Sequence, residues 1–176
     1  MRAHLSNFRR CYPWLHFVPR TAVVELATLG AVGRFKRAPG TLGSLVGILF
    51  YCLLFYKLDP LSFLLLNGLC AYLAIGICDA AEQHLQMRDP GMIVLDEFVA
   101  VPLVFFGMGG HQGLIHQNAG WPILLLGFGL FRTFDIIKPF GIKRLQNLPG
   151  GIGCVVDDYA AAIAACVCLH AIIFYF

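Results

Sequence analysis

Residues 94–100 read VLDEFVA, and the pattern returns at residues 155–161 as VVDDYAA. Each copy places an acidic doublet, Asp96-Glu97 or Asp157-Asp158, a few residues into a long apolar stretch. Ionisable side chains are costly inside a membrane and are retained there where they serve a function. Clusters of carboxylate oxygens suit a hard divalent cation. The repeat therefore predicts a helical membrane protein with a cation site.

The composition also favours lipid as the main solvent. Of the 176 residues, 59% are hydrophobic and 13% are charged, and the mean hydropathy is +0.74. Soluble domains carry about 25% charged residues, so the alternative is a soluble helical protein with a very apolar core. The net charge of +3 is interpreted as a basic face toward anionic lipid, not toward nucleic acid. The seven cysteines form no Cys-x-x-Cys pair and are predicted to be free thiols.

Hydropathy predicts an all-α fold, a polytopic membrane bundle of about five spanning or core helices. The predicted spans are residues 41–58, 61–80, 92–109, 121–138 and 153–174. Residues 1–40 are expected to form a cytoplasmic or interfacial segment, with an interfacial or re-entrant helix at 21–33. Residues 41–176 are expected to form the membrane-embedded catalytic domain.

The basic residues predict the orientation. Of the 13 Lys and Arg residues, all but Lys57 fall on the side of the amino terminus, which the positive-inside rule makes cytoplasmic. The loop at residues 107–120 contains no Lys or Arg and is expected on the periplasmic side with the carboxyl terminus. The polar segments 39–44, 89–97, 132–138 and 150–158 all fall on the cytoplasmic side. Their convergence on one membrane face predicts an interfacial active site.

The two acidic doublets are the predicted metal ligands. Asp96 and Glu97 lie at a similar depth to Asp157 and Asp158, on spans that run in the same direction. Neighbours in a helix diverge by about 100°, so one member of each pair is expected to bind metal while the other orients ligands or water. Mg²⁺ suits such a site because it keeps waters and needs few carboxylates besides substrate phosphate. Whether the site holds one ion or two is left open. The simpler alternative is that the acidic residues bind no metal and only interact favourably with the dipole at a helix start.

Three further segments offer phosphate ligands. PGTLGS at 39–44 and PGGIG at 149–153 precede apolar helices, whose free N–H groups accept phosphate, and Thr41 and Ser44 add hydroxyl groups. Ordinary capping and turn formation are the alternative for both segments. Arg132, Asp135 and Lys138 share one flank of a helix, where Asp135 can hold two cations that bind lipid phosphate. A self-neutralising trio at the membrane boundary is the alternative there.

Four segments resemble the phosphatidylglycerophosphatase A family and occur in the family's order. They are PGTLGS (39–44), DPGMIVLDE (89–97), FRTFDIIKP (131–139) and GGIGCVVDD (150–158). The resemblance implies a magnesium-dependent enzyme of the bacterial inner membrane that removes the terminal phosphate of phosphatidylglycerophosphate to give phosphatidylglycerol. Cys154 departs from the family pattern, which has an aliphatic residue there, and Gly141, Ala100 and Ala162 depart as well.

The expected site combines these assignments. Asp96, Glu97, Asp157 and Asp158 hold Mg²⁺ with help from Asp89, and water attacks phosphorus. The residues expected to bind phosphate are Thr41, Ser44, Arg132, Lys138, Gly150 and Gly151. An Asp nucleophile, a phosphatase of another lipid phosphate, and a cation transporter or channel remain alternatives. Homo-oligomer formation is left open.

Overall fold

The computed structural model describes residues 12–109, 120–139, 141–146 and 148–175. Cys11 and most of the expected periplasmic loop at 107–120 lie outside the described residues. Within these residues all regular structure is helical, which confirms the all-α prediction. The elements are η1 (Pro13–Phe17), α2 (Arg20–Ala27), α3 (Pro39–Phe50), the π-helix η2 (Tyr51–Phe55), α4 (Pro60–Leu85), α5 (Leu95–Val104), α6 (Gly120–Ile137), α7 (Ile142–Leu145) and α8 (Gly151–Tyr175).

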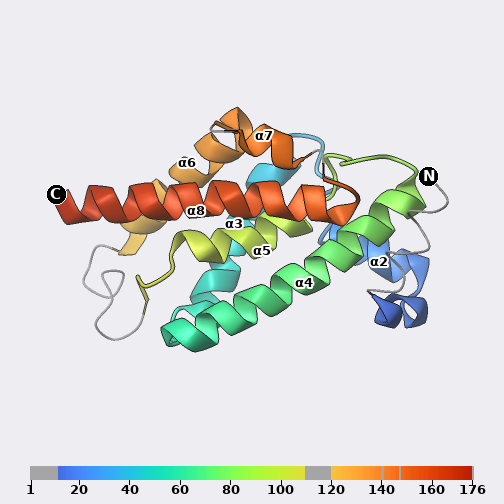
Figure 1. Ribbon diagram of the computed structural model, residues 1–176, viewed down its shortest axis with the longest axis horizontal. Coiled ribbons are helices and arrows are strands. Elements are labelled where there is room, and N and C mark those ends of the chain that lie inside the picture. The colour runs from blue at the N-terminus through green and yellow to red at the C-terminus, as the bar shows by residue number, and fades with distance from the viewer. Residues whose placement is uncertain (1–11, 110–119, 140, 147, 176) are drawn as a thin grey trace.

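Helix α5 is the centre of the bundle and packs against α3, α4 and α8 (Figure 1). It has ten residues and rises about 15 Å, half of a hydrocarbon core of about 30 Å. The prediction of one spanning helix at 92–109 is therefore wrong. Its apolar residues are buried among other helices and do not face lipid. The chain still reaches the far end of the bundle, because Gly109 lies close to the carbonyl oxygen of Tyr56.

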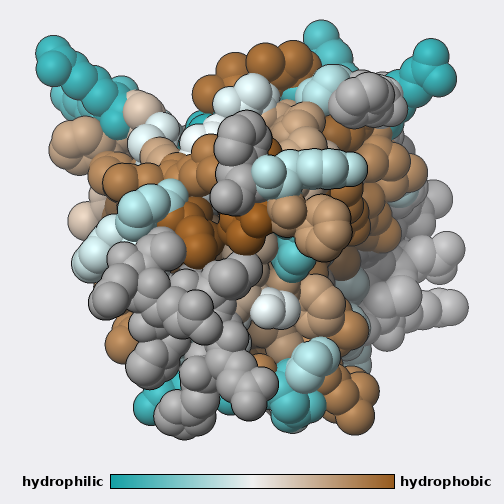
Figure 2. All heavy atoms as spheres, turned by 90° about the vertical axis from the view of Figure 1, so that its left-hand side faces the viewer, coloured by the Kyte–Doolittle hydropathy of each residue, from teal (hydrophilic) through white to brown (hydrophobic). Residues whose placement is uncertain are grey.

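Three helices, α4, α6 and α8, are long and apolar enough to cross a membrane. The segment Pro39–Phe55, formed by α3 and η2, is a shorter apolar helix. Large apolar side chains are exposed along these four segments, and soluble proteins rarely expose so many together. Examples are Leu45, Leu49, Leu53, Leu61, Leu65, Leu69, Leu125, Ile136, Ile163, Val167 and Phe174. Figure 2, which faces the left-hand end of Figure 1, shows hydrophobic atoms over much of the coloured surface. The chain is therefore a membrane protein.

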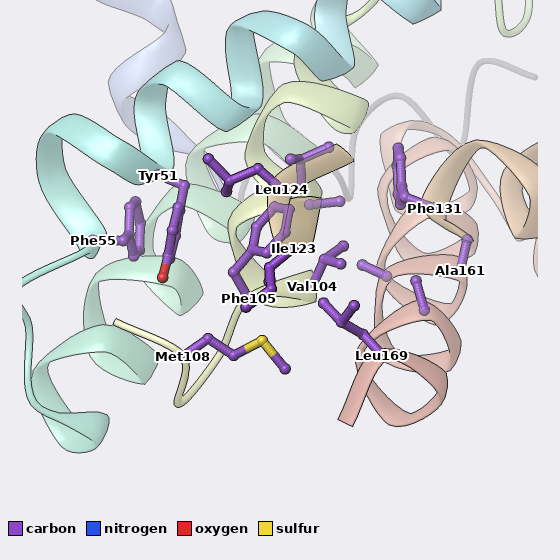
Figure 3. Packing of buried hydrophobic residues seen from close by; sticks show 14 of the residues in the cluster. Tyr51, Phe55, Val104, Phe105, Met108, Ile123, Leu124, Phe131, Ala161 and Leu169 are labelled. Carbon is purple, nitrogen blue, oxygen red and sulfur yellow. The ribbon is translucent and has the colours of Figure 1, made fainter. Parts of the chain in front are cut away.

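Two apolar clusters hold the helices together. The larger one joins η2, α4, α5, α6 and α8. Figure 3 shows Tyr51 and Phe105 near Ile123 and Leu124 of α6 on one side of it, with Leu169 and Ala161 of α8 on the other side. The smaller one joins α2, α4, α5 and α8 through buried residues that include Val23, Cys78 and Val155. The smaller cluster lies beside the acidic residues described below and fixes the helices that carry them.

Gly43 of the PGTLGS segment and Gly47, one turn further along α3, allow α3 to approach α5 closely. A Cβ atom at Gly43 would lie 2.8 Å from Cβ of Val94, and one at Gly47 would lie 2.9 Å from Cβ of Val101. Small residues at helix interfaces permit this approach in membrane bundles. These glycines therefore allow close helix packing. The predicted role of the PGTLGS segment in phosphate binding stays a prediction.

Candidate active site

Carboxylates from α5, α8 and the segments beside them meet in one pocket. Asp96 lies in the first turn of α5, while Asp157 and Asp158 lie in the second turn of the neighbouring α8, and all three are buried. The pocket has a volume of about 160 Å³. Its lining residues are Asp89, Gly91, Ile93, Asp96, Glu97, Asp135, Lys138, Cys154, Asp157 and Asp158. All five acidic residues predicted for the site, together with Lys138, therefore lie around the same space.

Arg132 binds acidic side chains of the protein itself. Its Nη1 donates to Oε1 of Glu97 at 2.9 Å and forms an ion pair with Oδ2 of Asp135 at 2.7 Å. It also donates to Oγ of Ser44 at 3.3 Å, and that hydroxyl donates in turn to the carbonyl of Gly40 at 2.8 Å. Arg132 and Ser44 contact groups of the protein itself in this structure, and the expectation that they bind phosphate stays a prediction. They hold Glu97 in place across the interface between α3, α5 and α6.

Lys138 is the cation that lines the pocket. Its Nζ contacts Oδ2 of Asp157 and lies 3.9 Å from Oδ1 of Asp135. Partial burial disfavours the charged amine, but the hydrogen bond and attraction from Asp157 outweigh burial, so the pKa of Lys138 is raised above its ordinary value. Its backbone φ is +46°, a left-handed conformation that is uncommon outside glycine and concentrates at functional sites. Lys138 therefore remains charged at the pocket.

Asp89 is held by several neighbours and also has a left-handed backbone, with φ of +45°. Its N–H donates to Oε1 of Glu82 at 2.6 Å, and its Oδ2 accepts from Nε2 of Gln146. Its Oδ1 accepts from the thiol of Cys154 at 3.3 Å. These bonds aim an otherwise exposed carboxylate at the buried acids of α5 and α8.

Cys154 belongs to the site, although the sequence was not interpreted that way. Its thiol donates to Oδ2 of Asp96 at 2.9 Å as well as to Asp89. Asp89, Asp96 and Cys154 offer ligand atoms that all lie within 4.8 Å of one another, and such a group can hold a metal ion. The sequence feature that could have identified Cys154 is its spacing, because it precedes Asp158 by four residues and therefore lies on the same helix face.

The pocket carries more negative than positive charge. Within the described part of the chain, Oδ1 of Asp157 and Oε2 of Glu97 are buried without a hydrogen-bond partner. Buried polar atoms are nearly always satisfied, and buried charges are paired or bind metals. Lys138 and the nearby Arg132 face six carboxylates, so the donor set fits a divalent cation.

Asp79 on α4 occupies the turn that opens α8. Its Oδ1 accepts from the N–H of Gly151 at 3.3 Å, and its Oδ2 accepts from Nε2 of Gln83 at 2.5 Å. A Cβ atom at Gly150, whose φ is +62°, would lie 2.1 Å from Oδ1 of Asp79, and one at Gly151 would lie 2.2 Å from the carbonyl oxygen of Ile75. The carboxylate of Asp79 therefore occupies the position beside Gly150 and Gly151 where a phosphate was expected, and phosphate binding by these two glycines stays a prediction.

Two residues show where sequence reasoning fell short. Thr41 lies in the first turn of α3 but does not line the pocket. Asp79 was overlooked, although an acidic residue within an apolar span is itself a signal of function. Asp79 positions the start of the helix that carries Asp157 and Asp158.

Comparisons with known proteins point to one family. A sequence model described as phosphatidylglycerophosphatase A matches residues 25–173. The Haemophilus influenzae protein of that name is 36% identical over 141 residues, which are 80% of this chain and 82% of the relative. The Escherichia coli protein of the same name is 29% identical over 134 residues, 75% of this chain and 72% of the relative.

A third relative carries a different name. A Bacteroides thetaiotaomicron protein, assigned provisionally as a phosphatidylinositol-3-phosphatase, is 30% identical over 130 residues, 72% of this chain and 77% of the relative. No solved structure gives a significant match.

Proposed function

Because the chain belongs to the phosphatidylglycerophosphatase A family, we propose that it hydrolyses the terminal phosphomonoester of phosphatidylglycerophosphate to phosphatidylglycerol, with Mg²⁺ as cofactor. The observation that carries this proposal is the pocket of carboxylates at one end of a membrane bundle, in which two buried oxygens have no hydrogen-bond partner among the residues that the structure describes. Such a pocket supplies what a cation and a phosphate together require.

Asp96, Glu97, Asp157 and Asp158 would hold the metal, with Asp89 beside them. Their oxygen atoms are the ligands that Mg²⁺ prefers, and a site with few direct carboxylates leaves room for waters and substrate phosphate. Bound Mg²⁺ would offset the phosphate charge and make a coordinated water more acidic. Which of the carboxylates contact the ion directly is part of the proposal.

The two cations of the site have different proposed roles. Lys138 lines the pocket and can donate to a phosphate oxygen while it stays near Asp157. Arg132 is bound to Glu97, Asp135 and Ser44, so it acts as a positioning residue that limits repulsion among the acids. Their combined effect is to keep the carboxylates oriented before substrate arrives, which lowers the cost of reaching the reactive geometry.

The membrane supplies the remaining orientation. Helices α4, α6 and α8, shown in Figure 1, anchor the bundle. The lining residues of the pocket come from the carboxyl end of α6 and from the amino-terminal turns of α5 and α8. A lipid whose acyl chains stay in the bilayer can present its head group there, which removes much of the entropic cost of alignment. We assign this end and residues 1–40 to the cytoplasmic face of a bacterial inner membrane, because the basic residues concentrate on that side.

The transporter alternative fits the geometry less well. Transporters bind their ions near the bilayer midplane. Here Asp96 is the second residue of α5, and Asp157 lies in the second turn of α8, so the carboxylates gather at one end of the bundle.

The test is phosphate release by purified protein in detergent micelles with added Mg²⁺. The substrates are phosphatidylglycerophosphate, phosphatidate and phosphatidylinositol 3-phosphate at equal surface concentration. We expect the fastest release from phosphatidylglycerophosphate, and an Asp157→Asn preparation serves as the background control. Faster release from another lipid would replace the proposed substrate, and no release from any lipid would overturn the proposal.

A further inference from the structure

Cys154 places a soft ligand among the hard ligands of the proposed magnesium site. Its thiol is 2.9 Å from Oδ2 of Asp96 and 3.3 Å from Oδ1 of Asp89, and its side chain is buried. Magnesium gains little from sulfur, whereas thiolate ligands select Zn²⁺ and related borderline or soft cations. The chemistry of these three side chains therefore differs from that of Glu97, Asp157 and Asp158 alone.

The three ligand atoms have nearly the spacing of a zinc site. With Zn–S of about 2.3 Å and Zn–O of about 2.1 Å, tetrahedral geometry separates sulfur from oxygen by roughly 3.6 Å. The observed separations are 2.9 and 3.3 Å, so an ion needs them to widen by less than 1 Å. The smaller adjustment can come from Asp89, which lies in a loop with an exposed side chain, and the larger one requires the buried side chains of Cys154 and Asp96 to move apart.

A second observation at the same pocket also points to a cation. Oδ1 of Asp157 is buried and lacks a hydrogen-bond partner within the described residues, and Asp157 is only 2% exposed. This atom is on a lining residue of the pocket that holds Cys154. Asp157 is not one of the three residues whose ligand atoms lie close together, but its oxygen shows that the same pocket leaves a buried carboxylate oxygen without a partner among the described residues.

We propose that Asp89, Asp96 and Cys154 bind Zn²⁺ or a similar thiophilic divalent cation, and that this ion blocks the phosphatase by displacing or distorting the Mg²⁺ site. The blockade rests on the proposed function, whereas the binding does not. As the metal–sulfur bond forms, the thiol proton that now bonds to Asp96 leaves to water, and no electron transfer occurs.

Binding is tested with Co²⁺ as a spectroscopic substitute for Zn²⁺. Purified full-length protein in detergent, kept reduced with a phosphine, is titrated with Co²⁺ and then with Zn²⁺. We expect a cobalt–thiolate charge-transfer band that Zn²⁺ abolishes. The band should be absent from Cys154→Ser. It should also be absent from Cys154→Val, an apolar replacement that serves if the serine variant does not fold.

Cys166→Ser is the matched control, because the thiol of Cys166 lies 3.6 Å from Nδ1 of His170 at the other end of α8 and offers a competing site. The control should keep the band. A band that is lost in Cys166→Ser, or that persists in both Cys154 variants, would overturn the assignment. Absence of the band from the unmodified protein would do the same.

The blockade is tested by Zn²⁺ inhibition of phosphate release at fixed Mg²⁺. Loss of a metal ligand's orienting partner commonly weakens binding about 10–100-fold, and loss of a ligand should cost no less, so half-inhibition of Cys154→Val should need at least about tenfold more Zn²⁺. Equal inhibition of both proteins would contradict the blockade. Hydrolysis without the cobalt band would refute the zinc site and leave the proposed function standing. A band without hydrolysis of any lipid would refute the function and support the site.

Discussion

Replacing Arg132 with methionine should separate the two possible roles of this guanidinium. In the structure Nη1 of Arg132 lies 2.9 Å from Oε1 of Glu97, 2.7 Å from Oδ2 of Asp135 and 3.3 Å from Oγ of Ser44. The side chains of Arg132, Glu97 and Asp135 are 17%, 14% and 10% exposed, so water compensates them poorly. Methionine keeps much of the apolar length and removes every donor.

The size of the effect follows from this burial. Removing one partner of a buried ion pair costs about 3–5 kcal/mol, because the other charge is left uncompensated. Here two carboxylates lose their partner, while nearby Lys138 still contributes to Asp135. We therefore expect a loss of about 3–5 kcal/mol in the free energy of unfolding, and a fall in kcat of about 100-fold, the upper end for lost orienting partners.

The assay compares Arg132→Met with Arg144→Met, an exposed arginine of α7. Thermal unfolding in detergent and steady-state phosphate release are measured on both. A positioning role lowers kcat and raises the Mg²⁺ requirement while KM for the lipid changes little. A rise in lipid KM at unchanged kcat and stability would refute the positioning role and restore direct phosphate contact by Arg132.

Three further outcomes are expected. Asp158→Asn should fold but lose at least about two orders of magnitude in turnover, since the asparagine weakens the metal site; near-normal turnover would show that the residue is structural. Gly47→Leu should lower the unfolding temperature because its side chain meets α5, whereas Gly68→Ala, which meets nothing within 4 Å, should be neutral or slightly stabilising; equal effects would contradict the close packing of α3 on α5. Single cysteines at Arg144 and Lys57, in a cysteine-free background, should be labelled from opposite sides of the membrane, and labelling from one side would contradict the orientation.

Much of the helical architecture follows from the sequence. Apolar runs bounded by proline or glycine predicted α4, α6, α8 and the combined segment of α3 and η2, with ends within about five residues. What hydropathy could not separate was burial in lipid from burial in protein. The residues of α5 are as apolar as those of the long helices, yet seven of its ten are buried in the bundle. An apolar run alone therefore overestimated the number of spanning helices.

The acidic residues of the site were also predictable, because charges within apolar segments are conspicuous. Their partners were not. Arg132 and Ser44 are separated by 88 positions, and Asp79 and Gly151 by 72, so these hydrogen bonds arise only when helices pack. The same holds for Cys154. Its place in an apolar segment predicted a small hydrophobic side chain and did not indicate its contacts with Asp89 and Asp96. Sequence pattern thus located the pocket, while packing decided what each side chain does in it.

The most direct test of the account is the metal dependence of phosphatidylglycerophosphate hydrolysis by the purified protein. The protein is treated with a chelator, assayed, and assayed again after Mg²⁺ is restored in excess. The carboxylate pocket predicts that chelation abolishes phosphate release and that Mg²⁺ restores it, with no restoration in Asp157→Asn. Undiminished release in the chelator would contradict the claim that these carboxylates act through a divalent cation.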